Sequence, residues 1–185
     1  MASIYRPFKA TDLFRISNIN LDSFTENYQV EMYLYYLARW PELNILIESP
    51  SGIPMGYVMG NVDGEGDQFH GHVTALTVSP LFRRLGVAER LMQLLEEVSD
   101  RKNAYFVDLF VRPSNVLAVS MYKKRDYVVY RTILDYYSGG PTKGPENAYG
   151  GHFRNSYRSR YAQISVPRSP KAFHGTGFEK PHPQQ

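Results

Sequence analysis

The clearest alternation of hydrophobic and polar positions lies in the middle of the chain, where a strand pattern changes into a helix pattern. Residues 72–78 are rich in β-branched side chains, which favour an extended chain. Ser79-Pro80 ends this strand, because proline cannot donate to a strand ladder. After Gly86 the apolar residues recur with a helical period, at Val87, Leu91, Leu94, Leu95 and Val98. Such a junction aims free N–H groups and the positive end of the helix dipole at one point, an arrangement that binds phosphate.

The rest of the pattern predicts a mixed α/β fold, that is, an α+β mixed sheet. Strands are expected at residues 4–8, 44–48, 53–62, 72–78, 104–111 and 127–136, and helices at 11–18, 30–39, 87–100 and 115–124. The element order is therefore β-α-α-β-β-β-α-β-α-β. The two strand-helix-strand steps between residues 72 and 137 require parallel pairing with right-handed crossovers.

The composition changes after residue 137. Residues 138–185 hold six of the 12 prolines and half of the 14 glycines, and only two residues among Ile, Leu and Val. They carry seven Lys/Arg against two acids, so their net charge is +5 and residues 1–137 carry −2 of the overall +3. We therefore expect a folded domain at 1–137 and a basic tail at 138–185 that is disordered or orders only on a partner. The high isoelectric point belongs to this tail and does not indicate a nucleic-acid-binding core.

Several classes of protein are excluded by composition. The chain has no cysteine, which rules out a disulfide scaffold, a thiolate nucleophile and a cysteine-based zinc site. We predict no signal peptide and no membrane span, since no apolar run is long enough. Gly-x-Ser-x-Gly does not occur. His70, His72, Asp63 and Asp67 have no defined ligand spacing, so no metal is expected.

The junction carries a recognisable motif. Arg83-Arg84-Leu85-Gly86-Val87-Ala88 matches R/Q-x-x-G-x-G/A, and Asn115-x-x-Ala118-x-x-x-Tyr122 follows downstream. In this element order, these motifs resemble the GNAT acetyltransferases over residues 4–137. One departure is Asp126, which stands where that family often has glycine after the last helix; Asp tolerates the left-handed conformation better than most residues.

Further segments are similar to one GNAT subfamily, the NatB type of N-terminal acetyltransferase. They include Trp40-Pro41-Glu42, Met55-Gly56-Tyr57-Val58-Met59-Gly60, His70-Gly71-His72-Val73-Thr74 and Val107-Asp108-Leu109-Phe110-Val111-Arg112. This resemblance implies acetyl transfer to protein N-termini that begin Met-Asp, Met-Glu, Met-Asn or Met-Gln. It also implies acetyl-CoA as cosubstrate, a large helical-repeat auxiliary subunit, and ribosome-associated work in the cytoplasm.

The resemblance assigns the cofactor to the junction and to the last helix. The implied cofactor-binding residues are Leu76, Val78, Arg83, Arg84, Gly86, Val87, Ala88, Asn115 and Tyr122. The pyrophosphate would rest on backbone N–H groups from Arg84 to Ala88. Two side-chain roles stay open. Arg83 either pairs with phosphate or forms a solvated surface pair, and Asn115 binds the pantetheine, caps its helix, or does both.

The implied catalytic residues are Tyr122, His72 and Thr74. Tyr122 would act as general acid toward the leaving thiolate, and the alternative is a packed core tyrosine. His72 and Thr74 alternate on one strand and so share a face. His72 would select the second residue of the peptide or serve as base through a water, unless it is simply a satisfied histidine in the sheet.

The implied peptide site has two walls. Glu26 and Tyr28 lie on the loop before the second helix, and Tyr136 and Tyr137 end the last strand. With His72 and Thr74 they would hold a methionine side chain and the peptide backbone. The alternative is that the tyrosine pair only ends a strand.

Two other functions stay open at this point. The chain could acetylate lysine or a small-molecule amine, or it could be a non-catalytic GNAT-like scaffold that docks a partner through the Tyr- and Leu-rich helix at 30–39. The basic tail could contact ribosomal RNA, but we expect a solvated extension, and we expect deletion of residues 141–185 to leave peptide acetylation unchanged.

Overall fold

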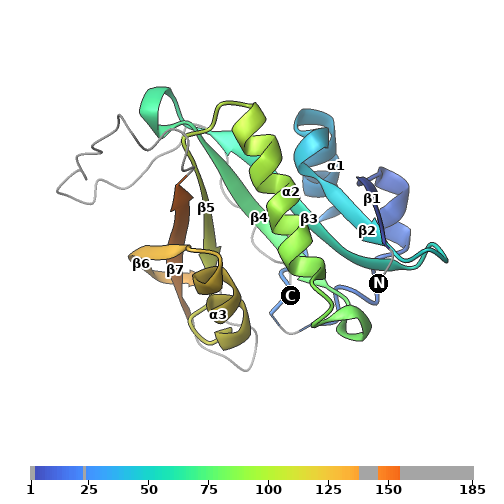
Figure 1. The fold of residues 1–185 in the computed structure, drawn as a ribbon. Helices are drawn as coiled ribbons and strands as arrows, with labels where there is room; N and C mark the ends of the chain where they lie inside the picture. The colour runs from blue at the N-terminus through green and yellow to red at the C-terminus, as the bar shows by residue number, and fades with distance from the viewer. Residues whose placement is uncertain (1–2, 23, 138–145, 155–185) are drawn as a thin grey trace.

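The computed structural model describes residues 3–22, 24–137 and 146–154, and these form a seven-stranded sheet with helices on both faces (Figure 1). Across the sheet the strands are β1 (Ile4–Pro7), β2 (Ile45–Glu48), β3 (Pro54–Asp63), β4 (His70–Val78), β5 (Phe106–Val111), β7 (Glu146–Arg154) and β6 (Val128–Tyr137). The α-helices are α1 (Val30–Arg39), α2 (Val87–Arg101) and α3 (Val116–Lys124). Short 3-10 helices are η1 (Ala10–Phe14), η2 (Pro41–Leu43), η3 (Gly66–Gln68) and η4 (Pro80–Phe82).

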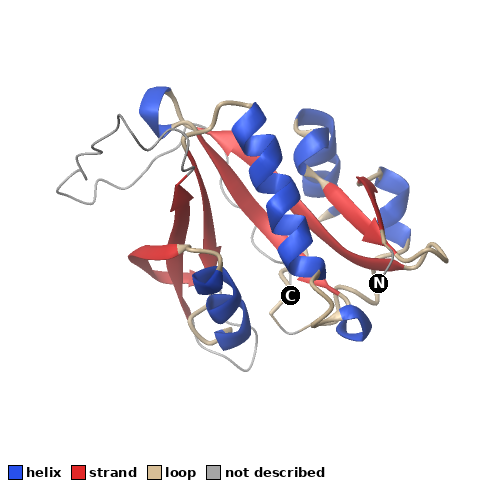
Figure 2. Ribbon diagram, viewed as in Figure 1, coloured by secondary structure: helices blue, strands red, loops and turns tan. Residues whose placement is uncertain are grey.

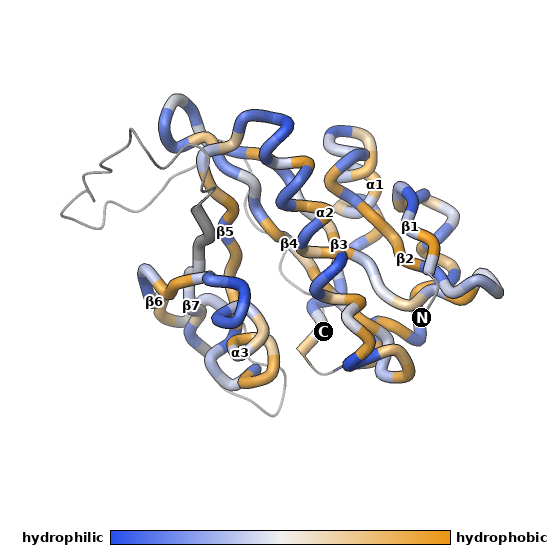
Figure 3. Tube along the Cα trace, viewed as in Figure 1, coloured by the Kyte–Doolittle hydropathy of each residue, from blue (hydrophilic) through white to orange (hydrophobic). Residues whose placement is uncertain are grey.

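Two hydrophobic cores lie on opposite faces of the sheet. Helix α2 supplies the first, with the buried side chains Leu91, Met92, Leu95 and Val98. Helix α1 supplies the second, where Tyr33 packs against Tyr57 and Met59. Strands β2 and β5 are largely hydrophobic, as expected for strands covered by helices (Figure 3). Gly71 lets α2 approach closely, because a Cβ there would lie 2.2 Å from the Ser99 Oγ.

Strands β4 and β5 form the parallel pair in this sheet, and they are paired over a short length. Their register runs from His70 opposite Phe106 to Val73 opposite Leu109. Beyond this point β4 continues to Val78 and pairs with β3 alone among the described strands. Figure 2 shows the two strands diverging toward the end of β4 that leads into α2. The predicted parallel step across α2 is thus confirmed.

A β-bulge lies where the two strands begin to diverge. Met59 pairs with Ala75 and Gly60 with Val73, so Thr74 is an extra residue on β4. The bulge reverses the alternation of side chains: Val73 packs toward α2, Ala75 toward α1, and Leu76 toward α2 again. After the bulge, each side chain of β4 therefore lies on the opposite face of the sheet from the one that strict alternation would give it.

The tail boundary predicted at residue 137 is wrong. Strand β7 lies between β5 and β6 and is antiparallel to both, so the sheet includes residues 146–154. The expected second parallel step is therefore correct in direction, but β5 and β6 are not neighbours. The signal was weak because Gly150 and Gly151 occupy the centre of β7, and glycine is depleted in strands. Residues 138–145 and 155–185 lie outside the described residues.

The first predicted helix, at 11–18, is also wrong, since this segment forms only the 3-10 turn η1. Asp12 is the reason: its carboxylate accepts hydrogen bonds from the Lys9 amide and from Arg6. Asp side chains that bind nearby backbone in this way favour turns over helix interiors. No helix among the described residues has the length and apolarity needed to cross a membrane.

Candidate active site

The loop that leads into α2 has the backbone shape of an anion cradle. Arg84 and Gly86 both take left-handed conformations, with φ of 61° and 77°. Gly86 is the N-cap of α2, and a Cβ there would meet nothing within 4 Å, so the left-handed φ of Gly86 rather than crowding favours glycine at this position. The first N–H groups of an α-helix have no partner within it. The phosphate cradle of residues 84–88 stays a prediction, which the left-handed backbone at Arg84 and Gly86 and the start of α2 at this point favour.

The Arg83 side chain is paired within the protein. Its guanidinium forms an ion pair with Asp22, on the loop after η1, and its Nε lies 3.4 Å from the Val78 carbonyl oxygen. Neither of the two interpretations left open for Arg83 included this contact. The arginine ties the cradle loop to the segment that precedes α1.

Where β4 diverges from β5, one backbone edge of β4 has no partner strand among the described residues. From Thr74 to Val78, the peptide groups of β4 that face β5 have no partner strand among the described residues. Leu76 and Val78 pack their side chains against the α2 core, so their contact with a ligand would be through the backbone. The Thr74 carbonyl accepts a hydrogen bond from the Tyr28 hydroxyl at 3.2 Å. An extended chain with amide groups could bind along this edge.

Thr74 also contacts α1 and β3 through its side chain. Its hydroxyl lies 3.1 Å from the Tyr36 hydroxyl and 3.4 Å from Asn61 Oδ1. The bulged residue is therefore held at both its carbonyl and its hydroxyl. Burial is the main reason that the pKa values of Tyr28 and Tyr36 are raised, so both phenols stay neutral.

Tyr122 lies in the last turn of α3, which ends in a Schellman motif. The Tyr127 amide donates to the Tyr122 carbonyl at 3.0 Å, and the Asp126 amide donates to the Lys123 carbonyl at 3.1 Å. Asp126 has φ of 63°, which confirms the left-handed cap expected at this position. The Tyr122 ring packs against the α2 core and lies 5.7 Å from the Tyr127 ring. Both the backbone and the ring of Tyr122 are therefore fixed.

Burial also changes the acidity of the Tyr122 hydroxyl. Burial raises its pKa well above the ordinary value, with a smaller contribution from Tyr137. The phenol is therefore protonated at neutral pH. Asn115 caps the same helix, since its side chain accepts from the Ala118 amide at 3.2 Å, which confirms the capping interpretation.

His72 is bound by a carboxylate that the sequence analysis did not single out. Its Nδ1 lies 2.6 Å from Asp108 Oδ1, on the neighbouring strand β5. Asp108 is 5% exposed, and the His70 Nε2 lies 3.6 Å from the same oxygen. Burial alone would raise the pKa of Asp108, but the His72 hydrogen bond and the charges of His72, His70 and Arg131 lower it. The one signal in the sequence was a single acid inside the apolar run of β5.

His70, His72 and Asp108 are the one group of potential metal ligands in the described parts of the chain, and their ligand atoms lie within 4.8 Å of one another. Asp63 and Asp67, which we considered with the two histidines, do not belong to it. The 2.6 Å contact has the length of a charge-assisted hydrogen bond, so a proton already satisfies the carboxylate and the imidazole.

The two predicted walls of the peptide site are brought together. Arg112, just after the end of β5, forms an ion pair with Glu26 and stacks over the Tyr137 ring at 3.9 Å from its centre. Tyr136 packs against Tyr137 and against Phe110, with ring centres 4.8 Å apart in each case. Sequence reasoning missed Arg112, whose partners come from distant segments. The walls are thus one connected aromatic and charged cluster.

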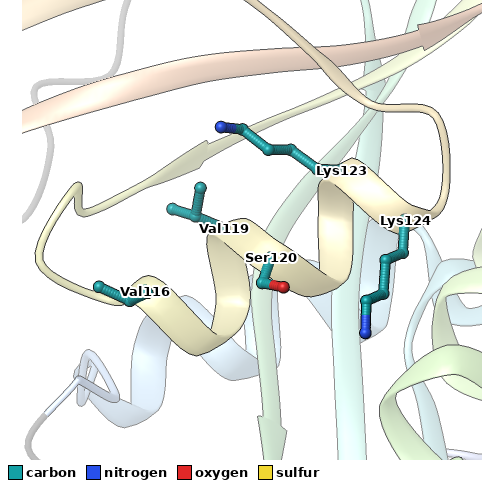
Figure 4. A pocket seen from close by; sticks show the side chains of 5 residues that line it. All are labelled: Val116, Val119, Ser120, Lys123 and Lys124. Carbon is teal, nitrogen blue, oxygen red and sulfur yellow. The ribbon is translucent and has the colours of Figure 1, made fainter.

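A shallow hollow of about 420 Å³, largely open to solvent, lies on the other side of α3. Figure 4 shows the five residues that line it: Val116, Val119, Ser120, Lys123 and Lys124. Tyr122 and Asn115 are not among them, and helical spacing places both on a different face. This hollow is therefore separate from the site described above.

Known proteins resemble the chain in both sequence and structure. The model of the acetyltransferase (GNAT) family matches residues 13–127. The catalytic subunit NAA20 of the N-terminal acetyltransferase B complex from Arabidopsis thaliana is 52% identical over 135 residues, which are 72% of this chain and 78% of that protein. The structure of Chaetomium thermophilum Naa20 in complex with a bisubstrate analogue has a TM-score of 0.81 and 36% identity, over 87% of this chain and 91% of that chain. A chain of the NatB acetyltransferase complex bound to CoA and MES has a TM-score of 0.73 and 34% identity, over 80% of this chain and 97% of that chain.

Proposed function

The chain belongs to the acetyltransferase (GNAT) family, and from that starting point we propose that it acetylates the α-amine of protein N-termini beginning Met-Asp, Met-Glu, Met-Asn or Met-Gln. It is an N-terminal acetyltransferase of the NatB catalytic-subunit type, like its relatives. The substrate preference, the route of transfer and the partners below are proposals. The observation that carries them is the divergence of β4 from β5 beside the N-terminus of α2.

The residues present fit acetyl-CoA. The pyrophosphate would bind the backbone N–H groups of residues 84–88, where the backbone at Arg84 and Gly86 is left-handed. The pantetheine amides would pair with the edge of β4 beyond its last pairing with β5, apart from the Thr74 and Val78 carbonyls, which Tyr28 and Arg83 contact. When bound, acetyl-CoA supplies the thioester whose acyl carbon the amine attacks, so that a C–N bond forms and the C–S bond breaks. With no cysteine in the chain, an acetyl-cysteine intermediate is excluded, and transfer is direct.

Tyr122 would donate its hydroxyl proton toward the leaving sulfur. Its raised pKa keeps the phenol protonated until negative charge develops on that sulfur. The peptide α-amine has an ordinary pKa of about 7.7–8.0, so it needs little help to become neutral. We therefore assign His72 to substrate selection rather than to general base catalysis.

The peptide would enter between the two walls that Arg112 connects. Tyr28, Tyr136 and Tyr137 offer aromatic surface for the methionine side chain. His72 and Thr74 follow on β4, where the second side chain of the peptide would lie. His72 is half-buried beside the Phe110 ring, 5.5 Å between ring centres, and has polar atoms to offer.

An auxiliary subunit would cover an exposed apolar surface around α1. The large hydrophobic side chains exposed there are Phe14, Leu21, Val30 and Leu34. Exposed apolar side chains grouped on neighbouring segments indicate a protein interface. We propose that this surface binds a helical-repeat subunit, and that the complex works at the ribosome in the cytoplasm. Leu34→Glu should weaken the complex at least tenfold in a titration, whereas Val116→Glu, at another exposed apolar site on α3, should not.

A peptide panel tests the substrate proposal. Peptides that begin Met-Asp, Met-Glu, Met-Asn and Met-Gln should be acetylated, with the chain alone and with its auxiliary subunit, in preference to peptides that begin Ser or Met-Leu. Matched peptides with a blocked α-amine and an internal lysine should not react. Transfer to the internal lysine would instead favour a lysine acetyltransferase, and failure to bind acetyl-CoA in calorimetry would favour a scaffold.

Tyr122→Phe tests the chemical step. We expect kcat to fall about 10²-fold or more, while acetyl-CoA affinity changes little. Tyr127→Phe is the matched control, because Tyr127 is also a buried tyrosine but donates its hydroxyl to Glu96. Equal turnover in the two variants would contradict the acid role of Tyr122.

A further inference from the structure

A short segment between η1 and α1, residues 24–28, is held against β4 by side chains rather than by strand pairing. The Thr25 Oγ1 lies 2.7 Å from the Thr77 Oγ1, and the Tyr28 hydroxyl donates to the Thr74 carbonyl at 3.2 Å. Thr74 and Thr77 both belong to β4. The segment forms neither helix nor strand, so its path over the sheet depends on these side-chain contacts.

The same segment reaches two parts of the proposed site. Glu26, which we assign with Tyr28 to one wall of the peptide site, forms an ion pair with Arg112 just after the end of β5. Immediately before the segment, Asp22 forms an ion pair with Arg83, the first residue of the motif that leads into α2. The segment therefore connects the predicted phosphate cradle with a wall of the peptide site.

The Asp22 carboxylate binds two different groups. Its Oδ1 accepts a hydrogen bond from the Phe24 amide at 2.7 Å, and its Oδ2 pairs with the Arg83 guanidinium. The Asp22 carbonyl accepts from the Thr25 amide at 3.0 Å, so the chain turns at this point. Burial alone would raise the pKa of Asp22, but the Phe24 amide and Arg83 lower it. One charged side chain thus forms the turn and ties it to Arg83.

Arg83 can keep this contact while an anion binds beside it. Its Nε lies 3.4 Å from the carbonyl oxygen of Val78, at the end of β4, and its Nη2 donates to Asp22. A guanidinium has five N–H donors, and the Arg83 side chain is 41% exposed. The ion pair with Asp22 is therefore compatible with a phosphate in the neighbouring cradle.

We propose that Asp22 is a positioning residue for the peptide site. Through the turn and through Arg83 it fixes residues 24–28, so that Glu26 and Tyr28 already lie at the wall when the peptide arrives. Ordering a loop costs conformational entropy, and contacts that order it beforehand reduce this cost on binding. Loss of the ion pair should therefore weaken peptide binding and leave the chemical step unchanged. This inference rests on the proposed function, because it concerns how that peptide is held.

Asp22→Asn tests the ion pair alone, because the asparagine oxygen can still accept from the Phe24 amide. The measurement is steady-state kinetics of the full chain with its auxiliary subunit. KM for a Met-Asp peptide should rise about fivefold, while kcat at saturating peptide changes by less than about twofold. KM for acetyl-CoA should not rise, because Arg83 keeps its charge beside the cradle.

A second pair of variants tests the contact of the segment with β4. Thr25→Val removes only the hydroxyl that contacts Thr77, and it should raise KM for the peptide about threefold. Thr25→Ser keeps a hydroxyl and should leave KM near the wild-type value.

Glu42→Gln is the matched control for loss of an ion pair. Glu42 pairs with Lys102, at the opposite end of α2 from the cradle. This variant loses the same charge as Asp22→Asn and should change neither KM value.

Each outcome decides the proposal. An unchanged KM for the peptide in Asp22→Asn overturns it, and so does a fall in kcat at unchanged KM, because that is the result of partial unfolding. If Asp22→Asn fails to fold, equal KM values in Thr25→Val and Thr25→Ser overturn the proposal instead. A wild-type chain that acetylates no peptide of the panel refutes the proposed function, and this inference with it. An active wild type with an unaltered Asp22→Asn variant refutes this inference alone.

Discussion

Each half of the sheet contains a buried aspartate, and the two aspartates are bound by different partners. Asp12, beside β1 and β2, is 2% exposed and accepts from both terminal nitrogens of Arg6, at 2.7 and 2.8 Å, and from the Lys9 amide at 2.8 Å. Asp108, in β5, is 5% exposed and is faced by two histidines. Arginine is always charged near neutral pH, whereas histidine gains and loses its proton there.

The two clusters differ in whether the positive partners of the aspartate can lose their charge near neutral pH. Arg6 also pairs with Glu48 on β2, and Arg15 reaches Glu48 at 2.9 Å, so the Asp12 cluster joins β1, η1 and β2 through permanent charges. The Asp108 cluster lies where β4 and β5 begin to diverge, beside the proposed peptide site. Equal burial therefore does not imply equal surroundings: Asp12 is held by a permanent charge, whereas Asp108 is held by side chains of a type that ordinarily titrates near neutral pH.

Of the changes described here, removal of β7 should reduce activity and stability the most. Strand β7 lies between β5 and β6, in the half of the sheet that contains Asp108. We expect a chain ending at residue 140 to lose acetyl transfer and part of its β-sheet signal in circular dichroism, contrary to the expectation from the sequence. A chain ending at residue 154 should keep both, since it retains the whole described sheet. Full activity in the shorter chain would mean that β5 and β6 function without their shared neighbour.

Asp12→Asn should have the next largest effect, and on stability rather than on catalysis. It leaves Arg6 partly buried with less compensating charge, and breaking a buried ion pair costs about 3 kcal/mol of unfolding free energy. Urea denaturation measures this loss, and Asp67→Asn is the control on an exposed turn. The ratio of kcat/KM for a Met-Asp peptide to that for a Met-Asn peptide should be unchanged. A changed ratio would show that the two halves of the sheet are coupled.

Acid should remove the same contribution in wild type. Burial alone would raise the pKa of Asp12, but Arg6, the Lys9 amide and Arg15 lower it, and a hydrogen bond from Arg6 is the main reason that the pKa of Glu48 is lowered. Carboxyls with a lowered folded-state pKa stabilise the fold above their unfolded value of about 4, and this stabilisation is lost as pH falls further. The stability difference between wild type and Asp12→Asn should therefore narrow below about pH 4. A constant difference would contradict the charge-based explanation.

Asp108→Asn should have the smallest effect on stability, about 1 kcal/mol. The asparagine oxygen can still accept from His72, so only the charged part of the hydrogen bond is lost. Urea denaturation of this variant beside Asp12→Asn compares the two carboxylates directly. A loss as large as that of Asp12→Asn would make Asp108 an anchor of the same kind.

The parts of this molecule that sequence could predict are those with local periodicity. The strand before Pro80, the helix after Gly86 and the spacing of Asn115 and Tyr122 all lie in segments whose pattern and structure agree. Helix α1 was also predicted with its observed bounds, because Trp40-Pro41 gives a physical end to it.

The parts that could not be predicted depend on distant pairings. Strand β7 has two central glycines, so its place in the sheet comes from β5 and β6 rather than from its own propensity. The partners of His72, Glu26 and Arg83 lie 36, 86 and 61 residues away. The residue types indicated that these side chains could take part in binding. The carboxylate or guanidinium that each one contacts depends on the fold, because the partners are far apart in the sequence.

The position of β7 also constrains the order in which the molecule can be assembled. During synthesis from the N-terminus, β5 and β6 are complete before the strand that separates them exists. The nascent chain must keep two hydrogen-bonding edges apart, or open them again, until residue 154 has been made. Long-range insertion of this kind slows folding and leaves strand edges exposed to wrong pairing. The slowest step in forming the peptide-binding wall is therefore expected to be the arrival of its last strand.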